Sequence, residues 1–359
     1  MSRQRIASVD LLRGLTITAM ILVNTPGSWS HVYAPLLHAE WHGWTPTDLV
    51  FPFFLYIVGC SIAFAYRDRS PTPAVYRKIT VRALKLIGLG LFLGAFTIYP
   101  PFFKPFAEWR FPGVLQRIGV CFFVAALVAI HAGWRTILGV VVALLVGYWA
   151  WLGFVPLPDG AEPTFARAAN NWAMYLDKLV FGNHTWQPDY DPEGLASTLP
   201  SVATTLIGVL AGRLLTNDRP QWRLPWLLGG GAGLLALGLA WSVAFPINKA
   251  LWTSSFVLVT AGVASLLLGS IYWWRDVRGR TFGELFRHVG ANALLLYFLS
   301  SFLSKVLGMS GVHAWVFDNV YVWPGMDPRL SSLLYALTVV SCYLALGEWL
   351  WRRKIFWRV

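Results

Sequence analysis

Long apolar runs alternate with short polar connections along almost the whole chain. A helix needs about 20 consecutive apolar residues to cross a bilayer, and ten segments of roughly this kind follow one another. They cover residues 11–29, 49–66, 80–99, 112–131, 135–154, 196–215, 224–245, 251–273, 290–308 and 330–351. The pattern therefore predicts an all-α polytopic membrane protein, with a bundle of ten transmembrane helices in one domain over residues 1–359.

The longest connection between these spans runs from about residue 155 to residue 195. It is rich in aromatic side chains, which disordered polar loops rarely carry, so we expect a folded cap. Within the cap, residues 166–181 have apolar positions at helical spacing and predict a short amphipathic helix.

The distribution of Lys and Arg predicts the orientation of the bundle. With ten spans, 20 of the 29 Lys and Arg residues, Arg3, Arg5 and Arg358 among them, fall on the side of the two termini, and 7 fall on the other side. Because basic residues concentrate on the cytoplasmic side of membrane proteins, we expect both termini in the cytoplasm and the cap outside. The net charge of +12 then reflects topology and contact with anionic lipids, and a nucleic-acid partner is not expected.

The composition agrees with a membrane protein and excludes several other classes. Only 13% of the residues are charged, about half the share found in soluble domains. The three Cys residues lie within apolar runs, so neither a disulfide framework nor a Cys metal site is predicted. The first residues are too short and polar for a cleaved signal peptide, and we expect the first span to be retained. The chain has no phosphate-binding or dinucleotide-binding fingerprint.

Polar groups at one expected depth form the first candidate site. Such groups are costly within lipid and are usually functional. Counting 1.5 Å per helical residue puts four of them near the outer third of the membrane: Asn24, His38, Asp48 and Arg117. His38 could act as a base or carry an acyl group.

Each of the four groups also has a structural interpretation. His38 by itself could equally be an ordinary histidine at the membrane interface. Asp48 fits the start of a helix, after Thr45. Arg117 could pair with Asp48 or with another outer carboxylate, and Asn24 could bond a neighbouring helix.

Two further clusters of polar residues lie at the inner and outer ends of the expected spans. Basic and amide groups at inner helix ends could hold an anionic cytosolic ligand, or anchor lipid headgroups; they are Arg13, Arg82, Lys85 and Asn292. A carboxylate, an amide and a Trp at the outer ends of the spans are the groups that a sugar-binding site needs; the residues are Glu193, Asn248, Lys249 and Trp252.

Zinc ligands could come from His31, His38, His42, Glu40 and Asp48, but their spacing matches no metal signature, and we predict no metal site.

Several long stretches resemble the transmembrane acyltransferases that include lysosomal heparan-α-glucosaminide N-acetyltransferase and its bacterial relatives from amino-sugar gene clusters. These stretches run from the first expected span to the ninth. They are RIASVDLLRGLTI (5–17), HAEWHGWTPTDLVFPFFLYIVG (38–59), RFPGVLQRIGV (110–120), YDPEGLASTLPS (190–201), PINKALWTSSFVLVTAG (246–262) and GANALLLYFLS (290–300).

The resemblance implies acetyl-CoA as a co-substrate that enters from the cytosol, with no tightly bound cofactor, and an amino sugar or related glycan as the acceptor on the far side. It implies that His38 is the active histidine, Asn24 its nearby asparagine and Asp48 the aspartate of the DLVFP motif, and that the protein forms homodimers. Ser255 is assigned with the inner cluster to the acyl-CoA site. His42 departs from the asparagine of the animal enzymes and, like His31, stays unassigned.

We therefore predict an integral membrane acyltransferase of the bacterial inner membrane, which moves an acetyl group from cytosolic acetyl-CoA to an extracytoplasmic amino sugar. The alternative is a membrane transporter of amino sugars such as N-acetylglucosamine, which would use the same polar groups as a substrate path. Direct transfer and an acetyl-histidine intermediate stay equally open, and so do longer acyl donors.

Overall fold

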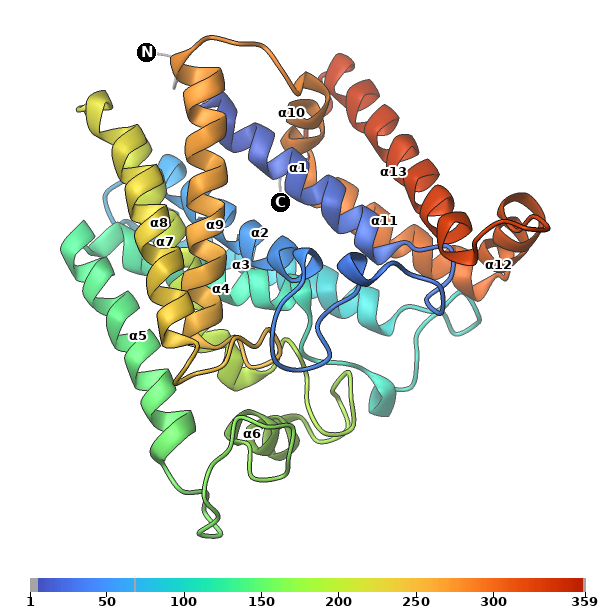
Figure 1. Cartoon of the computed structure of the whole chain (residues 1–359), viewed down its shortest axis with the longest axis horizontal. Helices are drawn as coiled ribbons and strands as arrows, with labels where there is room; N and C mark the ends of the chain where they lie inside the picture. Colours follow the sequence, from blue (N-terminus) through green and yellow to red (C-terminus); the bar gives the residue numbers. More distant parts are fainter. Residues whose placement is uncertain (1–5, 68, 358–359) are drawn as a thin grey trace.

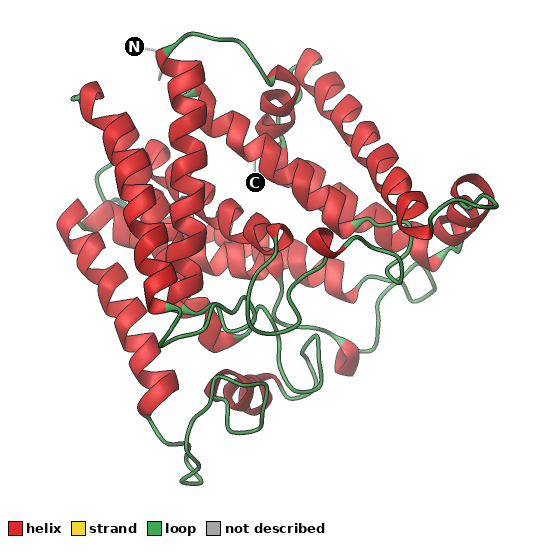
Figure 2. Ribbon diagram, viewed as in Figure 1, coloured by secondary structure: helices red, strands yellow, loops and turns green. Residues whose placement is uncertain are grey.

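The computed structural model describes residues 6–67 and 69–357, and within them it consists of helices and loops without a named strand (Figure 2). Arg3, Arg5 and Arg358 of the charge count lie outside the described residues. The helices, labelled in Figure 1, are α1 (Ala7–Asn24), α2 (Val50–Tyr66), α3 (Pro73–Ala95), α4 (Val114–His131), α5 (Trp134–Phe154), α6 (Trp172–Phe181), α7 (Leu195–Leu215), α8 (Arg223–Trp241), α9 (Ser254–Tyr272), α10 (Glu284–Ala291), α11 (Ala293–Met309), α12 (Val312–Val316) and α13 (Pro328–Arg352).

The number of spans is confirmed only in part. In the described part of the chain, eight helices are long and apolar enough to cross a membrane, or nine if α10 and α11, bent by 80° against each other, count as one span. The remaining expected span, 80–99, corresponds to α3, which starts earlier and has four cations in its first 13 residues. An all-helical membrane protein is therefore confirmed, whereas ten spans and the orientation of the termini stay predictions.

Further helix boundaries, those of α1 and of the cap helix, also differ from the sequence-based expectation. The first helix ends at Asn24, so Asn24 is its last residue, about 26 Å from Ala7 along the axis. In the cap, the helix begins only at Trp172, because the Asn171 side chain accepts a hydrogen bond from Ala173 N (3.0 Å) and starts it there. The expected helix over 166–181 is thus correct for its second part and wrong for residues 166–171.

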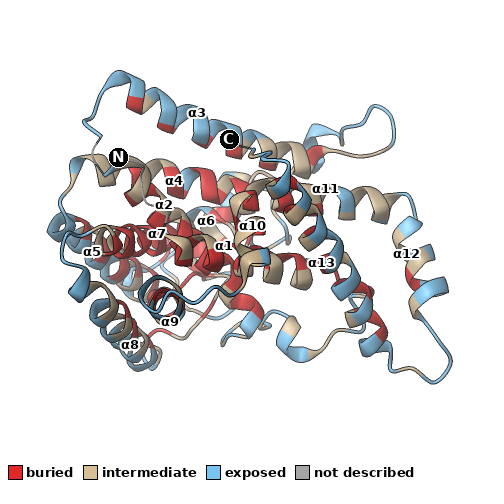
Figure 3. Cartoon of the chain, turned by 90° about the horizontal axis from the view of Figure 1, so that it is seen from above, coloured by how far each residue is buried: buried red, intermediate tan, exposed pale blue. Residues whose placement is uncertain are grey.

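Helices α2, α7 and α9 form the buried centre of the bundle, and α5 and α8 lie at its edge with much of their surface exposed (Figure 3). Helices α2 and α7 approach closely at Gly59 and Gly208. A Cβ atom at either glycine would lie 2.0 Å from a carbonyl oxygen of the facing helix. Close backbone approach at small residues is a common way to pack membrane helices, and here it fixes α2, which follows the His38 loop.

The long loops between α1 and α2, between α5 and α7, and between α8 and α9 gather at one end of the bundle (Figure 1). Hydrogen bonds join them, two of which involve the turn at residues 41–43. Gly43 N donates to Ile247 O (2.7 Å), and Trp41 Nε1 donates to Phe165 O (2.9 Å). Gly43 has a φ of 98°, which favours glycine at this turn. These contacts bring residues distant in sequence to one surface.

Candidate active site

The centre of the candidate site is the pair formed by His38 and Asp48. His38 Nδ1 lies 2.7 Å from Asp48 Oδ1. Since a carboxylate only accepts hydrogen bonds, a neutral His38 donates from Nδ1 and keeps the lone pair on Nε2. The His38 side chain is 51% exposed and that of Asp48 is fully buried. A buried acid therefore orients an accessible imidazole, as a catalytic base requires.

A tight turn holds Asp48 in place before α2. Residues Pro46–Leu49 form a 3-10 turn, and Asp48 accepts hydrogen bonds from Thr45 N (2.9 Å) and Ala39 N (3.1 Å). Thr45 is the N-cap of this turn and Asp48 the third residue of its capping box. The helix-start role expected for Asp48 is thus present, and the same carboxylate also binds His38.

Lys249 from the loop between α8 and α9 is the third member of this cluster. Its Nζ lies 2.9 Å from His38 Nδ1, 3.0 Å from His38 Nε2 and 3.6 Å from Asp48 Oδ1. The ammonium therefore lies within hydrogen-bonding distance of both ring nitrogens, and it can donate to the one that carries the lone pair. Burial lowers the pKa of Lys249, although the nearby Asp48 charge opposes this shift.

The other outer-depth residues do not join this pair directly. Asn24 is exposed at the end of α1, and its Nδ2 donates to Met20 O (2.9 Å) of its own helix. Helix α1 also contacts the Pro46–Leu49 turn, in which Asp48 lies. Arg117 is buried and donates to Gly194 O (3.0 Å) and to Ser197 Oγ. The expected pairing of Arg117 with a carboxylate is therefore replaced by a contact with the start of α7.

The expected sugar-binding residues lie in different environments. Trp252 is fully buried; Arg117 lies over its ring at 5.2 Å, and its Nε1 donates to Thr204 Oγ1 (3.0 Å). It therefore presents no open ring face to a sugar. Asn248 is also buried, and its Oδ1 accepts from Leu251 N (2.8 Å). Of the four, Lys249 and Glu193 are partly exposed, with 19% and 9% of their side chains accessible.

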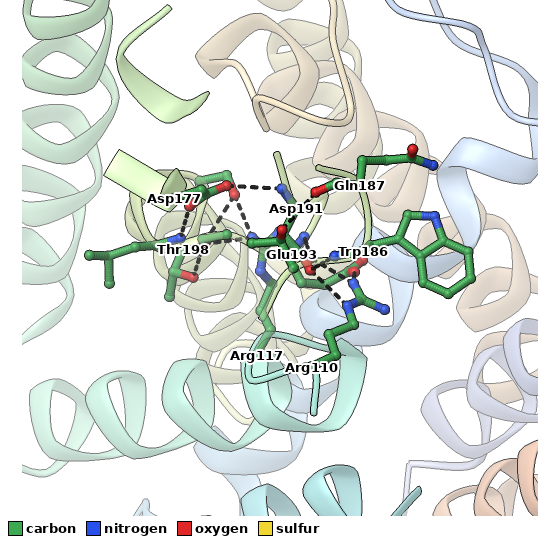
Figure 4. A network of polar contacts seen from close by, with 12 residues as sticks. Arg110, Arg117, Asp177, Trp186, Gln187, Asp191, Glu193 and Thr198 are labelled. Carbon is green, nitrogen blue, oxygen red and sulfur yellow. Dashed lines mark hydrogen bonds and ion pairs between the residues drawn. The ribbon is translucent and has the colours of Figure 1, made fainter. Parts of the chain in front are cut away.

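Glu193 belongs to a network of ion pairs that joins the cap to the bundle (Figure 4). Arg110 donates to both carboxylate oxygens of Asp191 (2.7 and 2.6 Å) and to Glu193 Oε2 (2.5 Å). Asp177 of α6 accepts from Asp191 N (3.1 Å) and from Leu195 N (2.9 Å). The segment before α7 is thus fixed from two sides, by the loop before α4 and by the cap helix.

Asp177 gives this network a measurable pH dependence. Burial raises the pKa of Asp177 to about 6, although its two backbone hydrogen bonds oppose the shift. A group with a raised native pKa favours the folded state below its unfolded pKa, and this contribution is lost as the pH rises through about 6. As the pH rises from about 4 to about 6.5, we expect the melting temperature of the wild type to decrease relative to that of Asp177→Asn. The measurement is thermal denaturation in detergent. A difference that is constant with pH, or that rises, would contradict this assignment.

A second candidate site is a cavity of about 820 Å³ at the opposite half of the bundle. It takes in four of the five residues expected to bind acyl-CoA: Arg13, Arg82, Lys85 and Asn292. The fifth, Ser255, is buried elsewhere and donates to Phe245 O (2.6 Å). The described residues that line the cavity include five cations and no acid, so the cavity suits an anionic ligand.

The cations of α3 lie together at the cavity because of their spacing along the helix. Lys78, Arg82 and Lys85 are spaced by four and three residues, which places them on one face of a helix. Arg13 faces them from α1 and is fixed by Asp10 (2.8 Å) and Ser61 Oγ (2.9 Å). On α2 the cavity extends from Tyr66 to Phe54, about 18 Å along the axis. Asp48 lies six residues beyond Phe54, about 9 Å further along the chain toward His38.

Sequence reasoning missed the Arg110–Asp191 ion pair and the role of Asp177. The charged partners are visible in the sequence, since the cap is rich in acidic residues and Arg110 precedes an apolar span. The sequence pattern does not predict which acidic residue forms an ion pair with which basic residue. In the described part of the chain, no group of three or more His, Cys, Asp or Glu residues could hold a metal ion.

Comparisons with known proteins identify relatives of this chain. Residues 5–239 match the family model described as "Heparan-alpha-glucosaminide N-acetyltransferase, catalytic". The chain is 29% identical over 425 residues to the Homo sapiens protein named heparan-alpha-glucosaminide N-acetyltransferase, a match that covers 99% of this chain and 60% of that protein. The Mus musculus protein of the same name is 27% identical, with 100% and 61% covered.

The chain spans about three fifths of the length of these two curated relatives. The family match covers residues 5–239, well over half of the chain, and includes α1 to α7 with His38, Asp48 and the cations of α3. The chain therefore belongs to the heparan-alpha-glucosaminide N-acetyltransferase catalytic family.

Proposed function

We propose that this protein transfers an acetyl group from acetyl-CoA, bound from the cytoplasmic side, to the amino group of an amino sugar or related glycan on the other side of the membrane. The observation that carries the proposal is the cationic cavity, which runs along α2 toward the end of the bundle where Asp48 holds His38. A cavity of this volume is within the range of ligand pockets. In this arrangement both termini are cytoplasmic and the membrane is a bacterial plasma membrane.

The cavity and the His38 pair divide the two substrates between them. The phosphates of acetyl-CoA lie among the cations of α3, and its pantetheine arm follows α2 toward His38 with the thioester leading. The acceptor reaches His38 from the loop side, near Glu193 and Lys249. This division explains why one polar cluster lies at each end of α2.

His38 Nε2 takes the proton of the acceptor amine as its nitrogen attacks the thioester carbonyl. The C–S bond then breaks, the acetyl group stays on the amine as an amide, and the coenzyme leaves as a thiol with the proton from His38. If His38 carries the acetyl group first, Nε2 is itself the attacking atom. Asn24 is the candidate for stabilising the thioester oxygen, a role worth roughly 3–4 kcal/mol where donors of this kind were removed elsewhere.

Lys249 contacts the proposed base directly, because its ammonium lies within hydrogen-bonding distance of both ring nitrogens of His38. We expect Lys249→Met to lower turnover, since it removes this donor and the positive charge beside Asp48. Lys249→Arg keeps a charged donor and should lower turnover less. Steady-state rates of the purified proteins test this, and equal rates for wild type and Lys249→Met would contradict it.

The proposed function is tested by purified protein in sealed vesicles, supplied with acetyl-CoA on one side and glucosamine on the other. Acetylated sugar should form, with release of one thiol per product. Uptake of unmodified sugar without acyl-CoA turnover would instead support the transporter. The same vesicles with acetyl-CoA supplied on the opposite face test the orientation of the cavity.

A further inference from the structure

The segment 353–357, which follows α13, turns back and lies against the cationic cavity. Lys354 has a φ of 56°, a left-handed conformation that a residue other than glycine adopts only when its surroundings hold it there. Beyond this reversal, Ile355 N donates to Leu350 O (3.0 Å). The turn is thus tied to the last part of α13 and directs the next residues toward α11.

The Asn292 side chain holds this segment at two points. Its Nδ2 donates to Ile355 O (2.9 Å), and its Oδ1 accepts from Trp357 N (3.0 Å). Asn292 is 2% exposed and lies at the break between α10 and α11. Both polar ends of its amide are therefore engaged by the backbone of 353–357, which leaves little capacity to bind a ligand directly.

Trp357 is one wall of the cavity. Its indole is part-exposed and lies near Phe298, with ring centroids 6.3 Å apart. The other walls carry the cations of α3 and Arg13. A part-exposed aromatic ring next to several cations is what a nucleotide requires, because the ring stacks on the base while the cations bind the phosphates.

We infer that the segment 353–357 is part of the acyl-CoA site, in which Trp357 stacks on the adenine base and Asn292 is a positioning residue that holds Trp357 over the cavity. This inference rests on the proposed function, and it assigns the nucleotide half of acyl-CoA to a specific wall of the cavity. It also gives Asn292 a different task from the direct ligand contact expected from the sequence.

The first test measures binding of adenosine 3′,5′-bisphosphate, the nucleotide half of coenzyme A, to the full chain by calorimetry. Stacking of one base on an aromatic ring corresponds to roughly a 5- to 150-fold change in affinity. Trp357→Ala should weaken binding by this factor, and Trp357→Phe should retain most of the affinity. Trp349→Ala is the matched control, because Trp349 is an exposed Trp of α13 that does not line the cavity.

The second test separates base stacking from a general loss of structure. Acetyl-pantetheine carries the thioester and the arm without the nucleotide. Trp357→Ala should raise the KM for acetyl-CoA and leave both kcat and the KM for acetyl-pantetheine unchanged. If the variant impairs both substrates equally, the stacking role is wrong.

The role of Asn292 is tested by a double-mutant cycle. If Asn292 acts through Trp357, Asn292→Ala weakens nucleotide binding, and adding it to Trp357→Ala causes no further loss. Additive losses would show a direct contact of Asn292 with the ligand and would overturn its positioning role.

The outcomes distinguish the inference from the proposed function. If the wild type turns over acetyl-CoA and Trp357→Ala behaves like Trp349→Ala, the inference fails and the proposed function stands. If the wild type neither binds the bisphosphate nor turns over acetyl-CoA, the proposed function fails and the inference fails with it.

Discussion

His38→Ala is expected to lower acetyl transfer by roughly 10²- to 10⁴-fold, the range for loss of a general base. The physical reason is that Asp48 orients an accessible imidazole ring, with the basic lone pair on Nε2. Binding of acyl-CoA should change little, because His38 does not line the cationic cavity. The measurement is the steady-state rate of thiol release and sugar acetylation by purified variants.

The matched control for this variant is His31→Ala, an exposed histidine of the same loop. It should retain the wild-type rate. An active His38→Ala variant would remove the base from the mechanism. Trapping of a radiolabelled acetyl group on His38 in the wild type, before acceptor is added, would exclude direct transfer as the sole route.

Asp48→Asn is expected to have an effect of similar size, roughly 10²- to 10⁴-fold in turnover. The Asp48 carboxylate accepts from Thr45 N and Ala39 N with one oxygen and binds His38 with the other. In Asn, the single amide oxygen satisfies the backbone N–H groups, and the NH₂ group then faces His38 Nδ1. This arrangement selects the tautomer with hydrogen on Nε2, and that tautomer has no base to offer the acceptor.

The Asp48→Asn variant is preferred to Asp48→Ala, because alanine would leave buried N–H groups without an acceptor and would endanger folding. Its folded state can be checked by binding of adenosine 3′,5′-bisphosphate at the opposite half of the bundle. Wild-type turnover in Asp48→Asn would show that orientation of His38 by a carboxylate is not needed. Loss of both turnover and nucleotide binding would indicate misfolding and call for a repeat with Asp48→Glu.

Much of the fold could be predicted because lipid imposes a simple rule on a chain. Each apolar run must form a helix to satisfy its backbone, so the helices fall close to the expected segments. The errors lie where a different rule applies. Helix α3 starts seven residues early because its cations face a cavity and not lipid. The ninth span breaks at Asn292, where the amide binds another segment.

The candidate site was predicted to a lesser degree. His38 and Asp48 lie ten residues apart in one loop, and their relation follows from the turn at Pro46–Leu49. Lys249 was expected at the acceptor, and its position beside His38 depends on the contact between Gly43 and Ile247. Depth along a helix suggested one site for Arg117 and Asp48, but depth does not specify the direction in which a side chain points.

Hydropathy and charge act along the chain, so the order of residues was enough to predict a helical membrane protein with polar groups near both ends of its spans. Long stretches that surround His38 and Asp48 also indicated the family. Which polar groups meet became visible in the folded protein alone. The pairing of Arg110 with Asp191, the position of Lys249 at His38 and the placement of Trp357 on the cavity all join residues far apart in the chain. Such contacts depend on how helices and loops pack in three dimensions, and no local pattern encodes them.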